Sequence, residues 1–231
     1  MSLSTRAGES HLGHPRPAAL GFCRQPASLT PIATTGIGIT PTTCCPAIND
    51  KGTVAFLAEI GAGGGVFVGD GTSLTPVAST AGQFQSFSDP DINNAGVIAF
   101  FGTLKNNVNG IFTVEGAGIH TVVHSIGSLV PSGFQFVATN SRGDVGFLGS
   151  QGSDGEGIYI DSGTRTDRVI GFGSELLGSE VTSVDFFRGG LNDRGHVAFY
   201  ATLSDGRVES FSPPSLPNRR VCYSSEWVRS A

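Results

Sequence analysis

The sequence predicts an all-β fold, a β-propeller-like array of about four repeats with four short strands each. Three observations predict it. An Asn-x-x-Gly motif followed by an apolar run occurs four times, with its asparagine at positions 49, 93, 140 and 192. The steps of 44, 47 and 52 residues are typical of propeller blades or solenoid coils. The apolar runs are rich in β-branched and aromatic residues, and no segment shows a helical period.

The composition favours a protein of many short strands and tight turns. Of the 231 residues, 34 are glycine, roughly twice the average usage, and only 14% are charged. The net charge of −5 lacks the basic surplus of a nucleic-acid-binding protein, so we expect no nucleic-acid partner. No run approaches the ~18 apolar residues that a membrane helix needs, so we expect no membrane span in this chain.

One repeat unit divides into four strands joined by polar turns. In the second unit we expect strands at 84–92, 97–104, 110–114 and 119–124. The matching pieces are 54–58 with 66–68 in the first unit and 145–149 with 158–160 in the third. The last unit supplies strands within 182–203 and a weaker one at 207–211.

The Asn-x-x-Gly motif is suited to a tight turn between the first and second strands of each unit. Asparagine bonds its own backbone two residues on, and glycine supplies the positive φ that such a turn needs. We therefore interpret these residues as structural. The strand after the turn is apolar on both faces, which indicates sheets stacked on both sides. Phe56, Phe100 and Phe199 are expected to be buried there.

The chain divides into three parts. Residues 1–28 are expected to form an unstructured leader rather than a secretory signal, because they lack an apolar stretch of roughly 7 to 15 residues. Residues 29–211 are expected to form the β-repeat domain, and residues 212–231 are expected to form an irregular tail. Residues 29–35 closely parallel 74–80 and are expected to be the fourth strand of a unit. If they complete the last unit, a four-bladed ring closes; the alternative is a fragment of a larger propeller with open edges.

The repeated text resembles a bacterial tandem-repeat family named for its NxxGxxAF units. Asn49, Gly52, Ala55 and Phe56 fit the pattern, and the second and fourth copies fit equally; in the third copy Gly146 stands where alanine is expected. Gly110-Ile111-Phe112 matches a second family motif. The resemblance covers roughly residues 29–211. It implies secreted or surface-attached β-repeat proteins with various C-terminal anchors, and it implies no catalytic residues.

The sequence contains no catalytic, metal or cofactor motif. The sequence has no nucleophile elbow, phosphate loop or zinc-protease helix. Asp89, Asp91 and Asn93 offer oxygens at alternate positions, but no glutamate closes a calcium loop, so we expect solvated carboxylates there. The loops after the second and fourth strands should gather on one face and offer a binding surface. Its speculative ligand-binding residues are Lys105, Asp154, Glu156, Glu175, Glu180 and Asp205.

Three functions remain open from the sequence. The favoured one is a non-enzymatic surface or extracellular binding or structural module of a bacterium, with a polysaccharide or a cell-surface protein as partner. The first alternative is a propeller hydrolase or lyase that acts on polysaccharide through Asp154 and Glu156 in the third repeat. The second alternative is a truncated fragment without independent activity. Fold alone does not decide between them.

Overall fold

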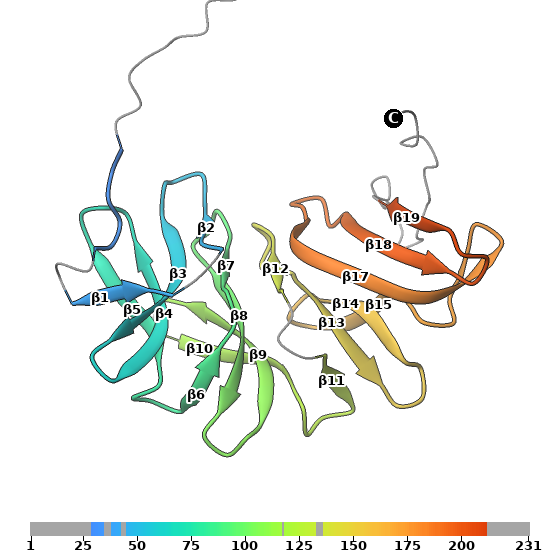
Figure 1. Cartoon of the computed structure of the whole chain (residues 1–231), viewed down its shortest axis with the longest axis horizontal. Helices are drawn as coiled ribbons and strands as arrows, with labels where there is room; N and C mark the ends of the chain where they lie inside the picture. The colour runs from blue at the N-terminus through green and yellow to red at the C-terminus, as the bar shows by residue number, and fades with distance from the viewer. Residues whose placement is uncertain (1–28, 35–37, 43–44, 117, 133–135, 212–231) are drawn as a thin grey trace, which may run out of the picture. The chain divides into compact units, whose positions relative to one another are not determined.

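The computed structural model describes residues 29–34, 38–42, 45–116, 118–132 and 136–211 (Figure 1). Within these ranges the chain is all-β, and its strands form four antiparallel sheets in chain order. No described helix has the length and apolar character needed to cross a membrane. The fold is a propeller-like array of repeats, as the sequence predicts.

Each of the first three sheets has five strands, and the fourth has four. The first sheet contains β1 (Ile39–Pro41), β2 (Ala47–Ile48), β3 (Val54–Ile60), β4 (Gly63–Gly69) and β5 (Leu74–Ser79). The second contains β6 (Phe84–Phe87), β7 (Asp91–Ile92), β8 (Ile98–Leu104), β9 (Asn109–Glu115) and β10 (Gly118–His124). The third contains β11 (Leu129–Pro131), β12 (Ala138–Thr139), β13 (Val145–Gln151), β14 (Glu156–Asp161) and β15 (Thr166–Gly171). The fourth contains β16 (Glu175–Leu176), β17 (Ser179–Leu191), β18 (Val197–Leu203) and β19 (Val208–Phe211).

The first strand of the second repeat is split where the sequence predicts one strand over 84–92. β6 and β7 both pair with β8 but are separated by residues 88–90. Pro90 lies in this interruption, and proline has no N–H for the strand ladder. The first and third repeats are split in the same way, so each presents two short strands to its long central strand.

Apolar clusters between consecutive sheets form the core. The cluster between the first and second sheets contains Phe84, Phe100 and Phe112, whose rings pack at centroid distances of 5.0 to 5.8 Å. Two further clusters join the second sheet to the third and the third to the fourth. The central strands β3, β8 and β13 each contribute alternate side chains to clusters on two sides, which confirms for them the stacking predicted from two apolar faces. β18 contributes to one cluster only, and Tyr200 on its other face is half exposed, so the predicted coverage on both sides is wrong for this strand.

The phenylalanine that ends each motif is buried, as predicted. Phe56, Phe100 and Phe199 are 4%, 0% and 3% exposed. Phe100 and Phe199 point toward the preceding sheet, because each belongs to the cluster shared with that sheet. Phe56 has no preceding sheet, and it lies in a smaller cluster with Ile39, Ala58 and Phe67.

Residues 31–34 do not complete the last repeat, so the expected ring closure by residues 29–35 is wrong for the described chain. Ile32 and Ala33 pack against the first sheet, on the cluster around Phe56. The first repeat also has its own first strand, β1 with β2, which the sequence analysis missed. These strands have only three and two residues, and prolines at 41 and 46 obscured their pattern. The predicted leader and tail lie outside the described residues.

Arg188 connects the fourth sheet to the first two. Its guanidinium Nη1 donates to the carbonyl oxygens of Cys45 and of Pro90, the latter at 3.0 Å. Charge-assisted hydrogen bonds of this kind are stronger than neutral ones. A single side chain of β17 therefore ties together segments that are 143 and 98 residues away in sequence.

Each sheet has two ends that differ in the connections they carry. We call the end with the Asn-x-x-Gly turns the turn end and the opposite one the loop end. In the third sheet Val145 pairs with Asp161 at the turn end, and Ser150 pairs with Glu156 at the loop end. Asp161 also pairs with Thr166, so the connection between β14 and β15 lies at the turn end as well.

Candidate functional site

The four Asn-x-x-Gly turns share one local structure. In the first, Oδ1 of Asn49 accepts hydrogen bonds from the backbone N–H groups of Lys51 and Thr53, at 3.1 and 3.0 Å. The N–H of Gly52 donates to the Asn49 carbonyl, and Gly52 has a φ of 79°. Only glycine adopts such a φ without strain, which explains its recurrence at this position.

The side-chain amides of these asparagines link consecutive turns in a ladder. Asn49 Nδ2 donates to the carbonyl of Asn93 at 3.1 Å, and Asn93 Nδ2 donates to the carbonyl of Asn140 at 2.6 Å. Asn140 Nδ2 in turn donates to the carbonyl of Asn192 at 3.1 Å. The first three asparagines are buried. The asparagine therefore shapes its own turn and also fixes that turn to the next one. The sequence predicted only the first of these two roles.

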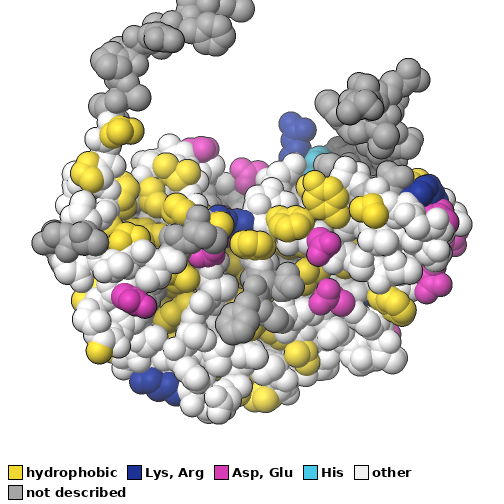
Figure 2. All heavy atoms as spheres, viewed as in Figure 1, with side chains coloured by type: hydrophobic (Ala, Val, Ile, Leu, Met, Phe, Trp, Pro, Cys, Tyr) yellow, Lys and Arg dark blue, Asp and Glu magenta, His cyan; other side chains and the backbone are white. Residues whose placement is uncertain are grey.

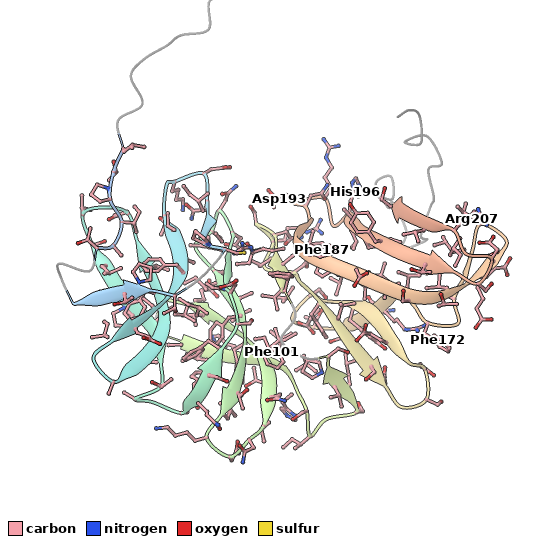
Figure 3. The ribbon with its side chains drawn as sticks, in the orientation of Figure 1. Phe101, Phe172, Phe187, Asp193, His196 and Arg207 are labelled. Atoms are coloured by element: carbon pink, nitrogen blue, oxygen red, sulfur yellow. The ribbon has the colours of Figure 1, made fainter. Side chains whose placement is uncertain are left out.

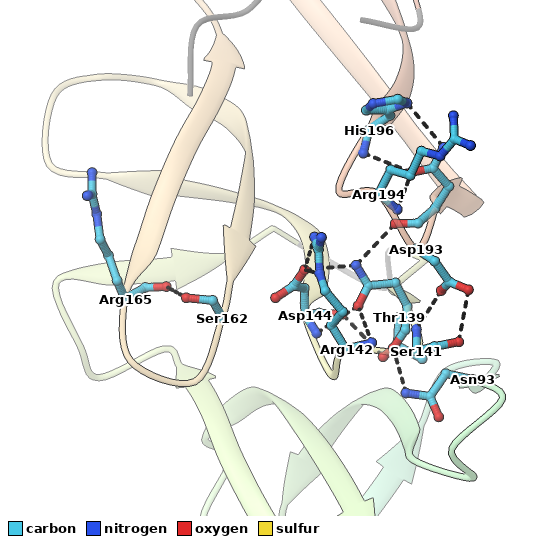
Figure 4. A network of polar contacts seen from close by, with 12 residues as sticks. Asn93, Thr139, Ser141, Arg142, Asp144, Ser162, Arg165, Asp193, Arg194 and His196 are labelled. Carbon is cyan, nitrogen blue, oxygen red and sulfur yellow. Dashed lines mark hydrogen bonds and ion pairs between the residues drawn. The ribbon is translucent and has the colours of Figure 1, made fainter. Parts of the chain in front are cut away.

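The residue after each asparagine adds a second link between turns. The backbone N–H of Ser141 donates to Asp193 Oδ1 at 2.7 Å, and its hydroxyl donates to Asp193 Oδ2 at 3.0 Å (Figure 4). Asp50 and Asn94 form the corresponding pair between the first two turns. The turn end is thus a continuous polar network that holds its exposed side chains in fixed positions.

A cleft of about 450 Å³ opens at the turn end, between the third and fourth repeats. The turns of both repeats and the connection from β14 to β15 surround it. Ile160 and Val169 supply apolar walls, and Ser162 supplies a hydroxyl. The remaining lining residues are Arg142, Asp144, Arg165, Asp167, Arg168, Arg194 and Gly195. With four arginines and two aspartates, the lining carries a formal charge of 4 − 2 = +2.

The arginines of the cleft differ in their partners. Arg142 forms an ion pair with Asp144 at 2.7 Å, and Arg165 forms one with Asp167. Arg194 is exposed, and no carboxylate among the described residues pairs with its guanidinium. Figure 4 shows Arg142 and Arg194 on neighbouring turns. Arg194 is therefore the cation in this cleft that is best placed to meet a bound anion.

Two contacts fix the shape of the cleft. A Cβ on Gly195 would lie 2.5 Å from Nη2 of Arg142, so the glycine of the fourth turn makes room for the arginine of the third. Arg168 lines the cleft, but its Nη2 donates to the carbonyls of Asp154 and Phe172, both at 2.9 Å. Its charge is directed toward the loop end, and its stem contributes mainly apolar surface.

The predicted ligand-binding residues lie at the loop end instead. Asp154 precedes β14 and Glu156 begins it, and both are exposed. Glu175 pairs with Glu180 across the β16–β17 hairpin, next to the loop that holds Asp205. Lys105 lies in the second repeat, in the loop between β8 and β9. The structure brings Glu175, Glu180 and Asp205 into one neighbourhood, and their role in binding stays a prediction.

One loop-end carboxylate, that of Asp205, is stabilised as an anion by its hydrogen-bond partners. Asp205 accepts hydrogen bonds from Arg207 and Ser179, and these hold the pKa of Asp205 well below its ordinary value. Figure 3 shows Arg207 and Asp193 at opposite ends of the fourth sheet. No group of three or more His, Cys, Asp or Glu side chains in the described ranges is arranged to hold a metal ion.

The sequence contains one local signal for the cleft, a recurring cation in the turns. Lys51, Arg142 and Arg194 occupy the same third position of their Asn-x-x-Gly turns, so three of four turns place a cation there. No local pattern indicates that Arg165 and Asp167 line the cleft. Their place there depends on how β14 and β15 bring their connection beside the Asn-x-x-Gly turns. Asp91 was expected to be solvated but is buried, and its Oδ2 accepts the backbone N–H of Thr139 at 2.8 Å.

Comparison with known proteins identifies the family. A family model described as "Family of unknown function (DUF7453)" matches residues 48–212, more than half of the chain. The chain belongs to this family. Comparison with curated protein sequences finds no match.

Solved structures show distant likenesses. A puromycin-hydrolyzing peptidase of Mycobacterium tuberculosis matches with a TM-score of 0.48 at 14% sequence identity. The match covers 77% of this chain and 28% of the peptidase chain. A six-bladed β-propeller lectin of Aleuria aurantia has a TM-score of 0.38 at 10% identity, covering 71% and 53%. The SapL1 lectin, in complex with α-methyl fucoside, has a TM-score of 0.42 at 8% identity, covering 78% and 63%. The chain spans less than two thirds of each of these solved chains.

Proposed function

We propose that the protein is a non-enzymatic binding module whose cleft between the third and fourth repeats holds an acidic sugar of a polysaccharide. The observation that carries this proposal is Arg194, an exposed guanidinium with no carboxylate partner among the described residues, at the edge of a cleft of about 450 Å³. A guanidinium presents a planar pair of donors that matches a carboxylate. The volume lies within the usual range of small-ligand sites.

The other lining groups favour a sugar over a simple anion. Asp144 and Asp167 are acceptors, and Ser162 both donates and accepts, so the cleft offers partners for hydroxyl groups as well as for a carboxylate. A uronic acid carries one carboxylate and several hydroxyls around a sugar ring, and one face of that ring is apolar. Ile160 and Val169 provide surface for that ring face. The proposal includes location at the cell surface, which the resemblance to NxxGxxAF repeat proteins implies.

Binding to oligogalacturonate, measured by calorimetry, tests the proposal. We expect Arg194→Ala to weaken binding by about tenfold or more, because a charge-assisted hydrogen bond contributes roughly 1.5 to 3 kcal/mol. Arg207→Ala is the matched control, since Arg207 lies at the loop end and pairs with Asp205. A neutral galactan oligomer should bind more weakly than the acidic one. Equal binding of both sugars, or equal loss in both variants, would contradict the proposal.

The polysaccharide-cleaving alternative depends on Asp154 and Glu156. Both are exposed, whereas a carboxyl that acts as an acid near neutral pH is usually held in an apolar environment. We therefore expect no sugar cleavage by the purified protein. Release of reducing ends that disappears in Asp154→Ala or Glu156→Ala would restore the enzymatic alternative.

A further inference from the structure

Near the Asn-x-x-Gly turns, the two outward faces of the stack carry matching, unused halves of the contact that joins the repeats, while Ile32 and Ala33 pack on the cluster around Phe56. The residue before each motif asparagine points toward the preceding sheet. At this position Ile92, Thr139 and Leu191 are 6%, 7% and 5% exposed, because a preceding sheet covers them. Ile48 stands at the same position of the first repeat and is 68% exposed.

The fourth sheet presents the complementary face. The second residue after the motif alanine position points toward the following sheet, and here Phe101 and Leu148 are 2% and 1% exposed. Tyr200 occupies this position in the fourth repeat and is 50% exposed. Its ring contacts that of Phe187, 45% exposed, at a centroid distance of 5.9 Å. Figure 2 shows apolar side chains on the surface over β17 and β18.

The asparagine ladder is open at the same two places. The carbonyls of Asn93, Asn140 and Asn192 each accept from a turn glycine and from the preceding asparagine. Among the described residues the Asn49 carbonyl accepts only from Gly52. The described residues contain no turn after that of Asn192, and Asn192 Nδ2 lies 3.3 Å from Nδ1 of His196. At one end of the ladder the Asn49 carbonyl thus lacks an amide donor from another turn, and at the other end the Asn192 amide contacts only its own turn.

We propose that a second copy of this chain docks head to tail, its first repeat against the fourth repeat of the first copy. In this contact Asn192 Nδ2 of one copy donates to the Asn49 carbonyl of the other, and Ile48 covers the face around Tyr200. The partner is a second copy because the same set of contacts already joins repeats three times within the chain. Such a heterologous contact closes into a ring or continues as a filament, depending on its rotation.

The residue after the asparagine sets the strength of this contact. Within the chain, Asp50 of the first turn pairs with Asn94 of the second, which both donates and accepts. In the proposed contact the carboxylates of Asp193 and Asp50 face one another, which weakens it at low salt. Asp50→Asn recreates the favourable pair and should lower the dissociation constant by about threefold to tenfold.

Light scattering on the purified chain over a range of concentrations tests the proposal. We expect a mass that rises with concentration to at least twice 23.8 kDa. Ile48→Asp and Tyr200→Asp should each remain monomeric, because each removes one side of every contact. An equimolar mixture of the two variants should recover a dimer, since one contact between them keeps both native sides. Ile126→Asp is the control, as Ile126 is 75% exposed and lies outside both faces.

Each other outcome overturns the proposal. A wild-type mass of 23.8 kDa at every concentration excludes association. If Tyr200→Asp abolishes association and Ile48→Asp does not, the contact is between two fourth sheets. If the mixture of the two variants stays monomeric, head-to-tail pairing is excluded. Thermal unfolding of both variants at wild-type temperature verifies that they are folded; if either is not, Ile48→Ala and Tyr200→Ala replace them in the same measurement.

Discussion

The junctions between repeats and the outward face of the fourth repeat are built from the same sequence positions but have different surroundings. At the junctions, the side chain two residues after the motif alanine position is covered: Phe101 and Leu148 are buried and Leu57 is partly buried. On the outward face the same position holds Tyr200, half exposed, and neighbouring strand positions hold Ser183, Asp185 and Thr202. The repeat pattern therefore specifies where a side chain points, whereas the adjacent sheet decides whether it is covered.

The largest expected difference is between truncations at this shared position. Phe101→Ala should cost about 3 to 5 kcal/mol, because it leaves a cavity between the second and third sheets. Tyr200→Ala should cost less than about 1 kcal/mol, since its ring is half exposed in the monomer. Urea unfolding of both variants, at a concentration where the protein is monomeric, measures the two costs. Equal costs would mean that the fourth sheet is covered in solution.

The departure of Gly146 from the motif offers a second comparison. A Cβ at this position would lie 2.8 Å from Cζ of Phe186, so the aromatic ring of the fourth sheet occupies the space of the expected alanine. Gly146→Ala should cost about 1 to 3 kcal/mol through overpacking. Combining it with Phe186→Leu should cost less than the sum of the two single changes. Additive costs in a double-mutant cycle would show that ring and glycine do not compete for this space.

The ladder predicts a smaller contrast between two asparagines. Asn140→Ala should cost about 1 to 3 kcal/mol beyond the loss of its turn, because the carbonyl of Asn192 loses its amide donor. Asn192→Ala removes only the turn contacts in the monomer, so its cost should be lower. Asn140→Asp keeps the turn acceptor, removes the amide donor to Asn192 and to Asp144, and sets a second carboxylate beside that of Asp144. The free energy of unfolding of the three variants gives the order.

The smallest expected effect is the pH dependence of the junction between the second and third repeats. Asp91 occupies a position where the other repeats have Ala47, Ala138 and Gly190, and burial raises its pKa above the ordinary value of 3.8. The folded state then binds the proton more tightly than the unfolded state, so this group's contribution to stability falls as pH rises above 3.8. Asp91→Asn should remove that decline. Parallel stability–pH curves for both proteins would contradict the prediction.

The sequence predicted the repeat architecture because local signals encode it. Each Asn-x-x-Gly turn is formed by contacts within five residues, and alternation of side chains along β8 and β18 places Phe100 and Phe199 toward one sheet. These contacts do not depend on how the neighbouring repeats pack. The four turns, their following strands and the burial of their phenylalanines were therefore readable from the chain alone.

Only the tertiary structure decided which residues meet across repeats. The cleft joins Arg142, Arg165 and Arg194, which belong to three different turns in two repeats, and Arg188 reaches carbonyls 98 and 143 residues away. Such contacts depend on the stacking and registry of whole sheets, which no local pattern encodes. The same reason explains why residues 31–34, although similar to a repeat strand, cover the first sheet instead of completing the last. Their sequence makes this segment apolar, and the outward face of the first sheet is where it packs.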